Sequence, residues 1–131
     1  MSALALALHR GVHDALAADA TVQAAGIAVC DHVPDHVAPP YLVLRPGTVR
    51  PWAGQLMRGA EITYSLHLWS AAAGRLEALR LMGLIGDCLK DGVAVIGGRL
   101  VLMFQELAEI RDDAGLIQAI MRYRALLEEE E

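Results

Sequence analysis

The sequence has few of the residues that mark metal, redox or phosphate-binding chemistry. Its 131 residues include two cysteines, Cys30 and Cys88, which lie far apart and form no CxxC pattern. That spacing excludes the common zinc and dithiol motifs and favours two unpaired thiols in a reducing compartment. No glycine-rich segment has the spacing and the lysine of a phosphate-binding P-loop. Aromatic residues make up 5% of the chain, so its apolar content is mostly Ala, Leu, Val and Ile.

Long apolar runs and an excess of basic residues are also missing. No uncharged apolar run approaches the roughly 18 residues of a membrane span, so we expect no membrane partner. The first residues, "MSALALALHRGVHDAL", lack the basic start of a secretion signal. We therefore expect the chain in the cytoplasm during its synthesis and assembly. The formal net charge of −5 disfavours general nucleic-acid binding.

Apolar side chains are abundant for so short a chain. Hydrophobic residues make up 55% of the sequence, and the mean hydropathy is +0.37. A chain of 131 residues is predicted to form one domain with a core of its own. A small domain has more surface than its core can use, so the surplus indicates burial against partner subunits.

The order of the predicted elements indicates an α+β fold: a single domain over residues 1–131, with a mainly antiparallel sheet and two helices on one face. Residues 47–59 are predicted to be a loop, the acidic residues 128–131 a frayed end, and Gly97-Gly98 the turn of a hairpin. The predicted helices cover residues 3–18 and 74–90, and the predicted strands cover 27–30, 41–46, 60–69 and 116–127, with two more flanking the glycine pair.

The second predicted helix is apolar around most of its circumference. Arg80, Asp87 and Lys90 form one narrow polar stripe, whereas a helix on a one-sided sheet needs an apolar arc of about 100°. Either the first helix covers the excess, or another subunit does. On the second interpretation the interface candidates are Leu81, Leu84 and Ile85, and glutamate at Leu84 or Ile85 is expected to break oligomers without unfolding the protomer.

The predicted loop at residues 47–59 is the second candidate interface. Thirteen residues make a long connector for a compact domain, and such loops are usually functional. Arg50 and Arg58 flank Trp52, a combination typical of protein-contact hot spots. The alternative is that Trp52 packs onto its own sheet.

Histidines supply the remaining candidates for chemistry. His9 and His13 are one helical turn apart, a spacing that can hold a metal, and His32 lies in the turn-like "DHVPDH". No third ligand is evident, and His67 has no orienting acid beside it in the sequence. We therefore predict no catalytic, cofactor-binding or metal-binding residues. A small-molecule-binding or enzymatic domain using His9, His13 and His32 is the less favoured alternative.

Several segments in order resemble one known family. An Ala/Leu-rich helix ends in "ADATVQA", and "VPDHVAPPYLVL" follows a short strand. The sequence continues with "LHLWS", "GRLEALRLMGLIGDCL" and "VIGGRLVLMF", and closes with "RDDAG" and "YRALLEE". In order and spacing, over nearly the whole chain, these segments resemble the tail-completion, or tail-terminator, proteins of long-tailed phages and gene transfer agents.

The resemblance implies a virion structural protein without catalysis or cofactors. Such proteins form a homo-oligomeric ring, typically a homo-hexamer, that caps the finished tail tube and ends its growth. The implied partners are other copies of the chain, the major tail tube protein and the head-side connector or stopper, with DNA only in transit through the ring. The implied location is the head–tail junction of a phage-like particle. Another subunit of the same head–tail joining region is the closest alternative.

Overall fold

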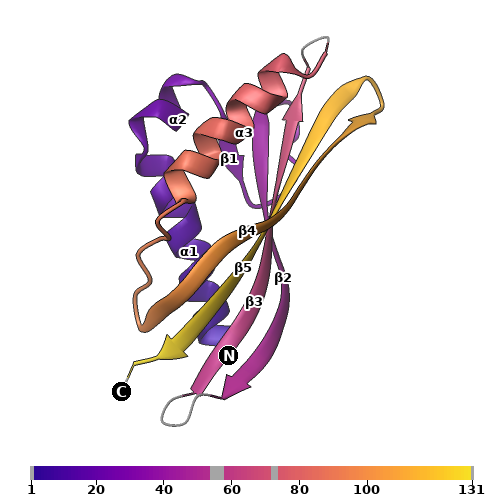
Figure 1. The fold of residues 1–131 in the computed structure, drawn as a ribbon. Helices are drawn as coiled ribbons and strands as arrows, with labels where there is room; N and C mark the ends of the chain where they lie inside the picture. Colours follow the sequence, from indigo (N-terminus) through magenta and orange to yellow (C-terminus); the bar gives the residue numbers. More distant parts are fainter. Residues whose placement is uncertain (1, 54–57, 72–73, 131) are drawn as a thin grey trace.

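A twisted five-stranded sheet carries the helices on one of its faces (Figure 1). The computed structural model describes residues 2–53, 58–71 and 74–130. The strand order is β1-β2-β3-β5-β4, with β1 parallel to β2 and the other pairs antiparallel. The elements are α1 Ser2–Ala18, α2 Ala20–Ala24, β1 Ala28–Cys30, β2 Tyr41–Ala53, β3 Arg58–Ser70, α3 Leu76–Leu89, β4 Gly98–Asp113 and β5 Leu116–Glu129. The predicted α+β class is confirmed, with α2 as an additional short helix.

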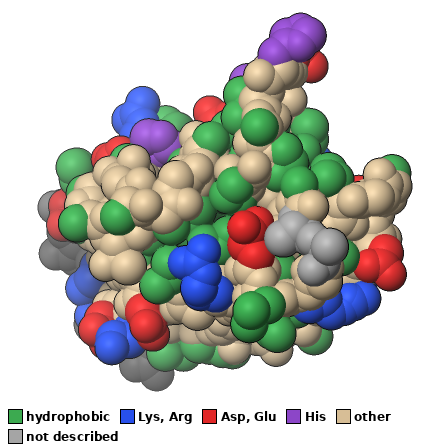
Figure 2. All heavy atoms as spheres, turned by 90° about the horizontal axis from the view of Figure 1, so that it is seen from above, with side chains coloured by type: hydrophobic (Ala, Val, Ile, Leu, Met, Phe, Trp, Pro, Cys, Tyr) green, Lys and Arg blue, Asp and Glu red, His purple; other side chains and the backbone are tan. Residues whose placement is uncertain are grey.

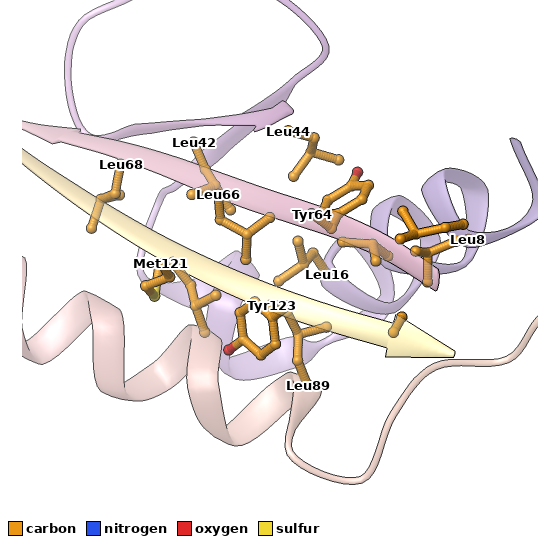
Figure 3. Packing of buried hydrophobic residues seen from close by; sticks show 14 of the residues in the cluster. Leu8, Leu16, Leu42, Leu44, Tyr64, Leu66, Leu68, Leu89, Met121 and Tyr123 are labelled. Atoms are coloured by element: carbon orange, nitrogen blue, oxygen red, sulfur yellow. The ribbon is translucent and has the colours of Figure 1, made fainter. Parts of the chain in front are cut away.

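The core lies between the sheet and the two long helices. Buried leucines and valine recur at a spacing of four residues along α1, which places them on one side of the helix. Alternate residues of β3 and β5 meet them (Figure 3). The contributions of α1 and of the central strand β3 are Leu4, Leu8, Val12, Leu16, Ile62, Tyr64, Leu66 and Leu68.

For helix α3 the structure favours the first of the two interpretations, in which the protomer itself covers most of the apolar surface. Leu81 and Ile85 are 0% exposed and belong to the main core. The interpretation of these two residues as an interface is therefore wrong, because α1 and the sheet already enclose them. Leu84 is half-buried against the same core and keeps a partly accessible side. The outer surface of α3 instead presents Leu76 and Leu79.

Helix α3 starts two residues later than the predicted helix over 74–90. Arg75 is its N-cap residue, and the Arg75 side chain makes no capping hydrogen bond. Glu77 lies in the first turn and accepts a hydrogen bond from the Ser70 hydroxyl at 2.5 Å. This hydrogen bond links the end of β3 to the start of α3.

The predicted loop at 47–59 is mostly strand. β2 continues to Ala53 and β3 begins at Arg58, so the two strands form a long hairpin whose tip, residues 54–57, lies outside the described residues. The pairing register shifts between Pro46 and Val49. β1 pairs with β2 only as far as Val43, so the rest of β2 has a neighbour on one side. Proline is tolerated on such an edge.

The segment before β4 does not form the predicted hairpin strand. Residues 93–96 cross over α1 as an irregular segment, and β4 starts at Gly98. Val93 and Val95 pack against the core. The crossing is close, because a Cβ at Gly11 would stand 2.4 Å from the Ala94 carbonyl oxygen.

The last two strands form the longest hairpin of the sheet. Its turn is Ala114-Gly115, both with positive φ, as a two-residue hairpin of this twist requires. The tip points away from the helices in Figure 1. β5 continues through Glu129, and Glu128 forms an ion pair with Arg99. Two of the four acids expected in a frayed end are therefore part of the sheet. No helix in the described ranges is long and apolar enough to cross a membrane.

Candidate functional site

The sheet face opposite the helices is here called the open face, and none of the helices in the described part of the chain lies over it (Figure 1). Side chains alternate along each strand, so the neighbours of the core residues of β3 point to this face: Thr63, Ser65, His67 and Trp69. At the end near β1 a small second cluster covers part of it. Tyr41 stacks on Trp69 at a ring-centroid distance of 5.4 Å, and Val43 is buried with them. The rest of the face is available to a partner.

An apolar patch lies on the open face along the edge strand β4. The pairing register with β5 places Leu102, Phe104 and Leu107 on this face, with exposed fractions of 48%, 43% and 43%. β4 pairs with β5 on one side, and its other edge has no strand beside it. An exposed apolar edge strand is a typical association site, because its backbone and side chains both lack partners.

Two arginines without carboxylate partners lie on the same face: Arg122 is next to the patch, opposite Leu107, and Arg45 is on β2. Arg45, Ser65 and Arg122 occupy one row across β2, β3 and β5. Among the described residues no ion pair involves Arg45 or Arg122, whereas Arg124 bridges Glu61 at 3.3 Å and Glu106 at 2.6 Å. The open face therefore combines exposed apolar side chains with free guanidinium groups, as protein interfaces commonly do.

The three residues predicted in the long loop lie instead on the β2–β3 hairpin. Arg50 is opposite Glu61 on the open face, and Arg58 is exposed at the start of β3. Trp52 is half-buried over its cross-strand neighbour, since a Cβ at Gly59 would stand 2.6 Å from the Trp52 Cε3 atom. Trp52 therefore does pack onto its own sheet, on the same face as Arg50, whereas Arg58 pairs with Ala53 and points to the other face.

His67 lies at the centre of the open face, and among the described residues its hydrogen-bond neighbour is the Gln118 amide rather than a carboxylate or a nucleophile. The Gln118 side-chain amide lies 3.2 Å from the His67 Nδ1. Burial lowers the pKa of His67, and the positive charges of Arg45 and Arg111 lower it further. His67 is therefore neutral at pH 7. The nearby Trp69 indole donates to Asp113 at 3.2 Å, so that carboxylate is engaged elsewhere.

His9 and His13 contact different side chains and do not converge on one site. The His9 Nδ1 atom lies 2.5 Å from the buried Tyr64 hydroxyl, and its Nε2 lies 2.8 Å from Asp31. This chain of contacts ties α1 to the segment after β1. His13 contacts its neighbour Asp14 at 3.1 Å, and His32 is exposed. Within the described part of the chain, no three metal-ligating side chains gather in one place.

Both cysteines are unpaired and partly buried. The Cys88 thiol lies 3.5 Å from the Ala15 carbonyl oxygen, across the α1–α3 contact. Burial, with Asp19 nearby, raises the pKa of Cys88 to about 11, and burial also raises that of Cys30. Because the thiolate is the reactive form, neither residue is an activated nucleophile.

The helix side carries an apolar groove of about 460 Å³ between α1 and residues 93–96. Small residues of α1, including Ala7 and Gly11, form part of its lining. Leu6 and Ile96 also line it, and Ile96 is 90% exposed. Arg10 and Asp14 are its charged residues. On the molecular face in Figure 2, by contrast, charged side chains of both signs are interspersed among hydrophobic ones.

Neither the β4 patch nor this groove was predicted from the sequence. The available signal was the run "LVLMF" after Arg99, which has no polar residue at alternate positions. Such a run indicates a strand that is apolar on both faces. The groove could not have been predicted, because it depends on how residues 93–96 cross α1.

Comparisons with known proteins agree with this architecture. The chain aligns with a solved chain described as "Virion of native gene transfer agent (GTA) particle" at 29% identity and a TM-score of 0.87, covering 98% of this chain and 99% of that one. It also matches "Structure of bacteriophage SPP1 gp17 protein" at 18% identity and a TM-score of 0.64, covering 92% and 88%, which supports the fold. No curated protein matches.

The family comparison covers most of the chain. The family described as "Tail completion protein gp17" matches residues 10–128, which include the second half of α1 and all but the last residue of β5. The matched region also contains the hairpin arginines and the β4 patch. The chain belongs to the tail completion protein family.

Proposed function

We propose that the protein forms a ring of six copies that caps the tail tube, ends tube growth and joins the tail to the head-side connector. Its family makes it a structural component of the virion and not an enzyme. The observation that carries the proposal is the near-complete alignment with a chain of a gene transfer agent virion. DNA passes through the ring without being held, which agrees with the net charge of −5.

Two different association surfaces support the ring. The β4 patch lies on the open face, and the α1 groove lies on the helix side. A ring built by rotation needs two unlike surfaces on each subunit, whereas a two-fold dimer uses one surface twice. A protomer with both surfaces can contact two neighbours at once. The copies are expected to assemble in the cytoplasm before they become part of the particle.

Deletion of the gene tests the proposed role directly. Without the cap, tubes are expected to grow to irregular and excessive lengths and to remain unattached to heads, as seen by negative-stain electron microscopy. Supplying the intact gene from a plasmid is the matched control. On wild-type tails a ring of about 85 kDa, six times 14.1 kDa, is expected at the head-proximal end. Tails of normal length joined to heads in the deletion strain would contradict the proposal.

The β2–β3 hairpin is proposed to contact the tail tube or the connector. Changing Arg50 and Arg58 together to glutamate is expected to leave the ring intact and to lower the fraction of tailed particles about tenfold, the effect of roughly 1.4 kcal/mol at the contact. Counting tailed particles by electron microscopy measures this. Arg80→Glu on the exposed surface of α3 is the matched charge control. An unchanged tailed fraction in the double variant would remove the hairpin from the docking surface.

A further inference from the structure

The β4 patch is a projecting apolar surface that the protomer itself leaves uncovered. Phe104 is the chain's single phenylalanine, and it lies on the open face between Leu102 and Leu107. Burying a side chain of this size contributes about 1.5–3 kcal/mol relative to leaving it in water. The exposure of three such neighbours on an edge strand therefore indicates burial against another molecule.

The α1 groove has the opposite shape. It is a hollow whose floor includes small side chains of α1 and whose wall includes the almost fully exposed Ile96. The close crossing at Gly11 and Ala94 fixes the spacing of its two sides. The groove lies on the helix side, and the projecting Phe104 lies on the open face, so one protomer cannot bring them together.

The charges of the two sides are complementary. The open face carries six of the 11 basic residues and five of the 16 acidic ones, so five basic and ten acidic described residues lie elsewhere. The arginines of the open face are Arg45, Arg50, Arg99, Arg111, Arg122 and Arg124. An open face with a positive balance is attracted to the acidic remainder of a second copy.

We propose that the helix layer of one protomer covers the open face of the next, with Phe104 seated in the α1 groove against Leu6 and Ile96. The occupant of each surface is thus a second copy of this chain. The contact joins unlike surfaces and leaves a joined pair with one free patch on one protomer and one free groove on the other, so it repeats until a ring closes. This inference rests on the proposed ring and assigns its subunit interface.

Cysteine cross-linking within assembled particles tests the assignment. In a Cys30→Ala/Cys88→Ala background, the double variant Ile96→Cys/Phe104→Cys is treated with a short bismaleimide and analysed on a denaturing gel. A ladder of covalent oligomers is expected from the double variant. Each single variant is the matched control and is expected to give no product, because the two thiols of a contact come from different positions.

Other outcomes distinguish an error in the interface assignment from an error in the proposed ring. Self-cross-linking of the Phe104→Cys single variant would show two open faces in contact and would overturn the assignment. So would a double variant that gives no ladder in particles whose tails still carry a ring. A chain that is absent from tail ends would instead contradict the proposed function.

Mixing two charge variants provides a second readout that does not depend on thiols. Phe104→Glu and Ile96→Glu change exposed side chains, so both variants are expected to fold and to lose self-assembly. In an equal mixture, the Phe104→Glu variant supplies an intact α1 groove and the Ile96→Glu variant supplies an intact β4 patch. They are therefore expected to form a dimer of about 28 kDa and nothing larger. Full assembly by either variant alone would overturn the proposed contact.

Discussion

Replacing Ile85 with glutamate is expected to unfold the protomer rather than release a folded monomer from an oligomer. The Ile85 side chain is 0% exposed between α1, α3 and the sheet. Glutamate there would lose the apolar burial and place a carboxylate in a site without water, at a cost of about 4 kcal/mol or more. That is a large part of the roughly 5–15 kcal/mol that stabilises a domain. Far-ultraviolet circular dichroism should show no cooperative thermal transition.

Leu79→Glu is the matched control on the same helix. Leu79 is 55% exposed on the outer surface of α3, so glutamate there stays in water. We expect this variant to keep the wild-type spectrum and to melt within a few degrees of the wild type. If Ile85→Glu melted like Leu79→Glu, the Ile85 side chain would have to be accessible, and the earlier interpretation of Ile85 as an interface residue would be restored.

Local periodicity was sufficient to predict most of the elements. The four-residue spacing along α1 and the alternation along β3 each depend on one segment and its core-facing side. The positive-φ turn of the β4–β5 hairpin follows from Asp-Ala-Gly between two strand-forming runs. Such features can be predicted from sequence because neighbouring residues alone decide them.

The incorrect predictions share a different cause: in each case contacts with distant parts of the chain determine the structure. Gly47 and Pro51 made residues 47–53 look like a loop, yet β2 is an edge strand over most of its length, where proline is tolerated. "VAVI" has the composition of a strand, but it crosses α1 instead of pairing. The apolar circumference of α3 suggested an interface, although the core encloses most of that surface.

The same distinction between local sequence and tertiary context separates the interface residues that were predicted from those that were missed. Arg50, Trp52 and Arg58 were selected by residue type, and the structure brings them to one hairpin because β2 and β3 pair along their whole length. Phe104 and Ile96 were missed, because a linear sequence does not show which side of an edge strand remains open or where a hollow forms. Exposure, which selects these two residues, is a property of the folded protomer.

Gly11→Ala is expected to destabilise the protein even though it improves the helix. Alanine in a helix interior is favoured over glycine by about 1 kcal/mol. At Gly11, however, the new Cβ would stand 2.4 Å from the Ala94 carbonyl oxygen and 3.1 Å from the Val93 side chain. Residues 93–96 would have to move away from α1, which we expect to cost about 1–3 kcal/mol more than the helix gains. The melting temperature should fall by several degrees.

Gly83→Ala is the matched control, because the same substitution in α3 meets no atom within 4 Å. There the helix gain stands alone, so the melting temperature should rise, and the two variants should shift in opposite directions in the same calorimetric experiment. The displaced segment also forms one side of the α1 groove. Gly11→Ala should therefore weaken ring assembly while Gly83→Ala leaves it unchanged. A stabilised Gly11→Ala protein would mean that residues 93–96 do not lie against α1, and the groove would then lose its fixed shape.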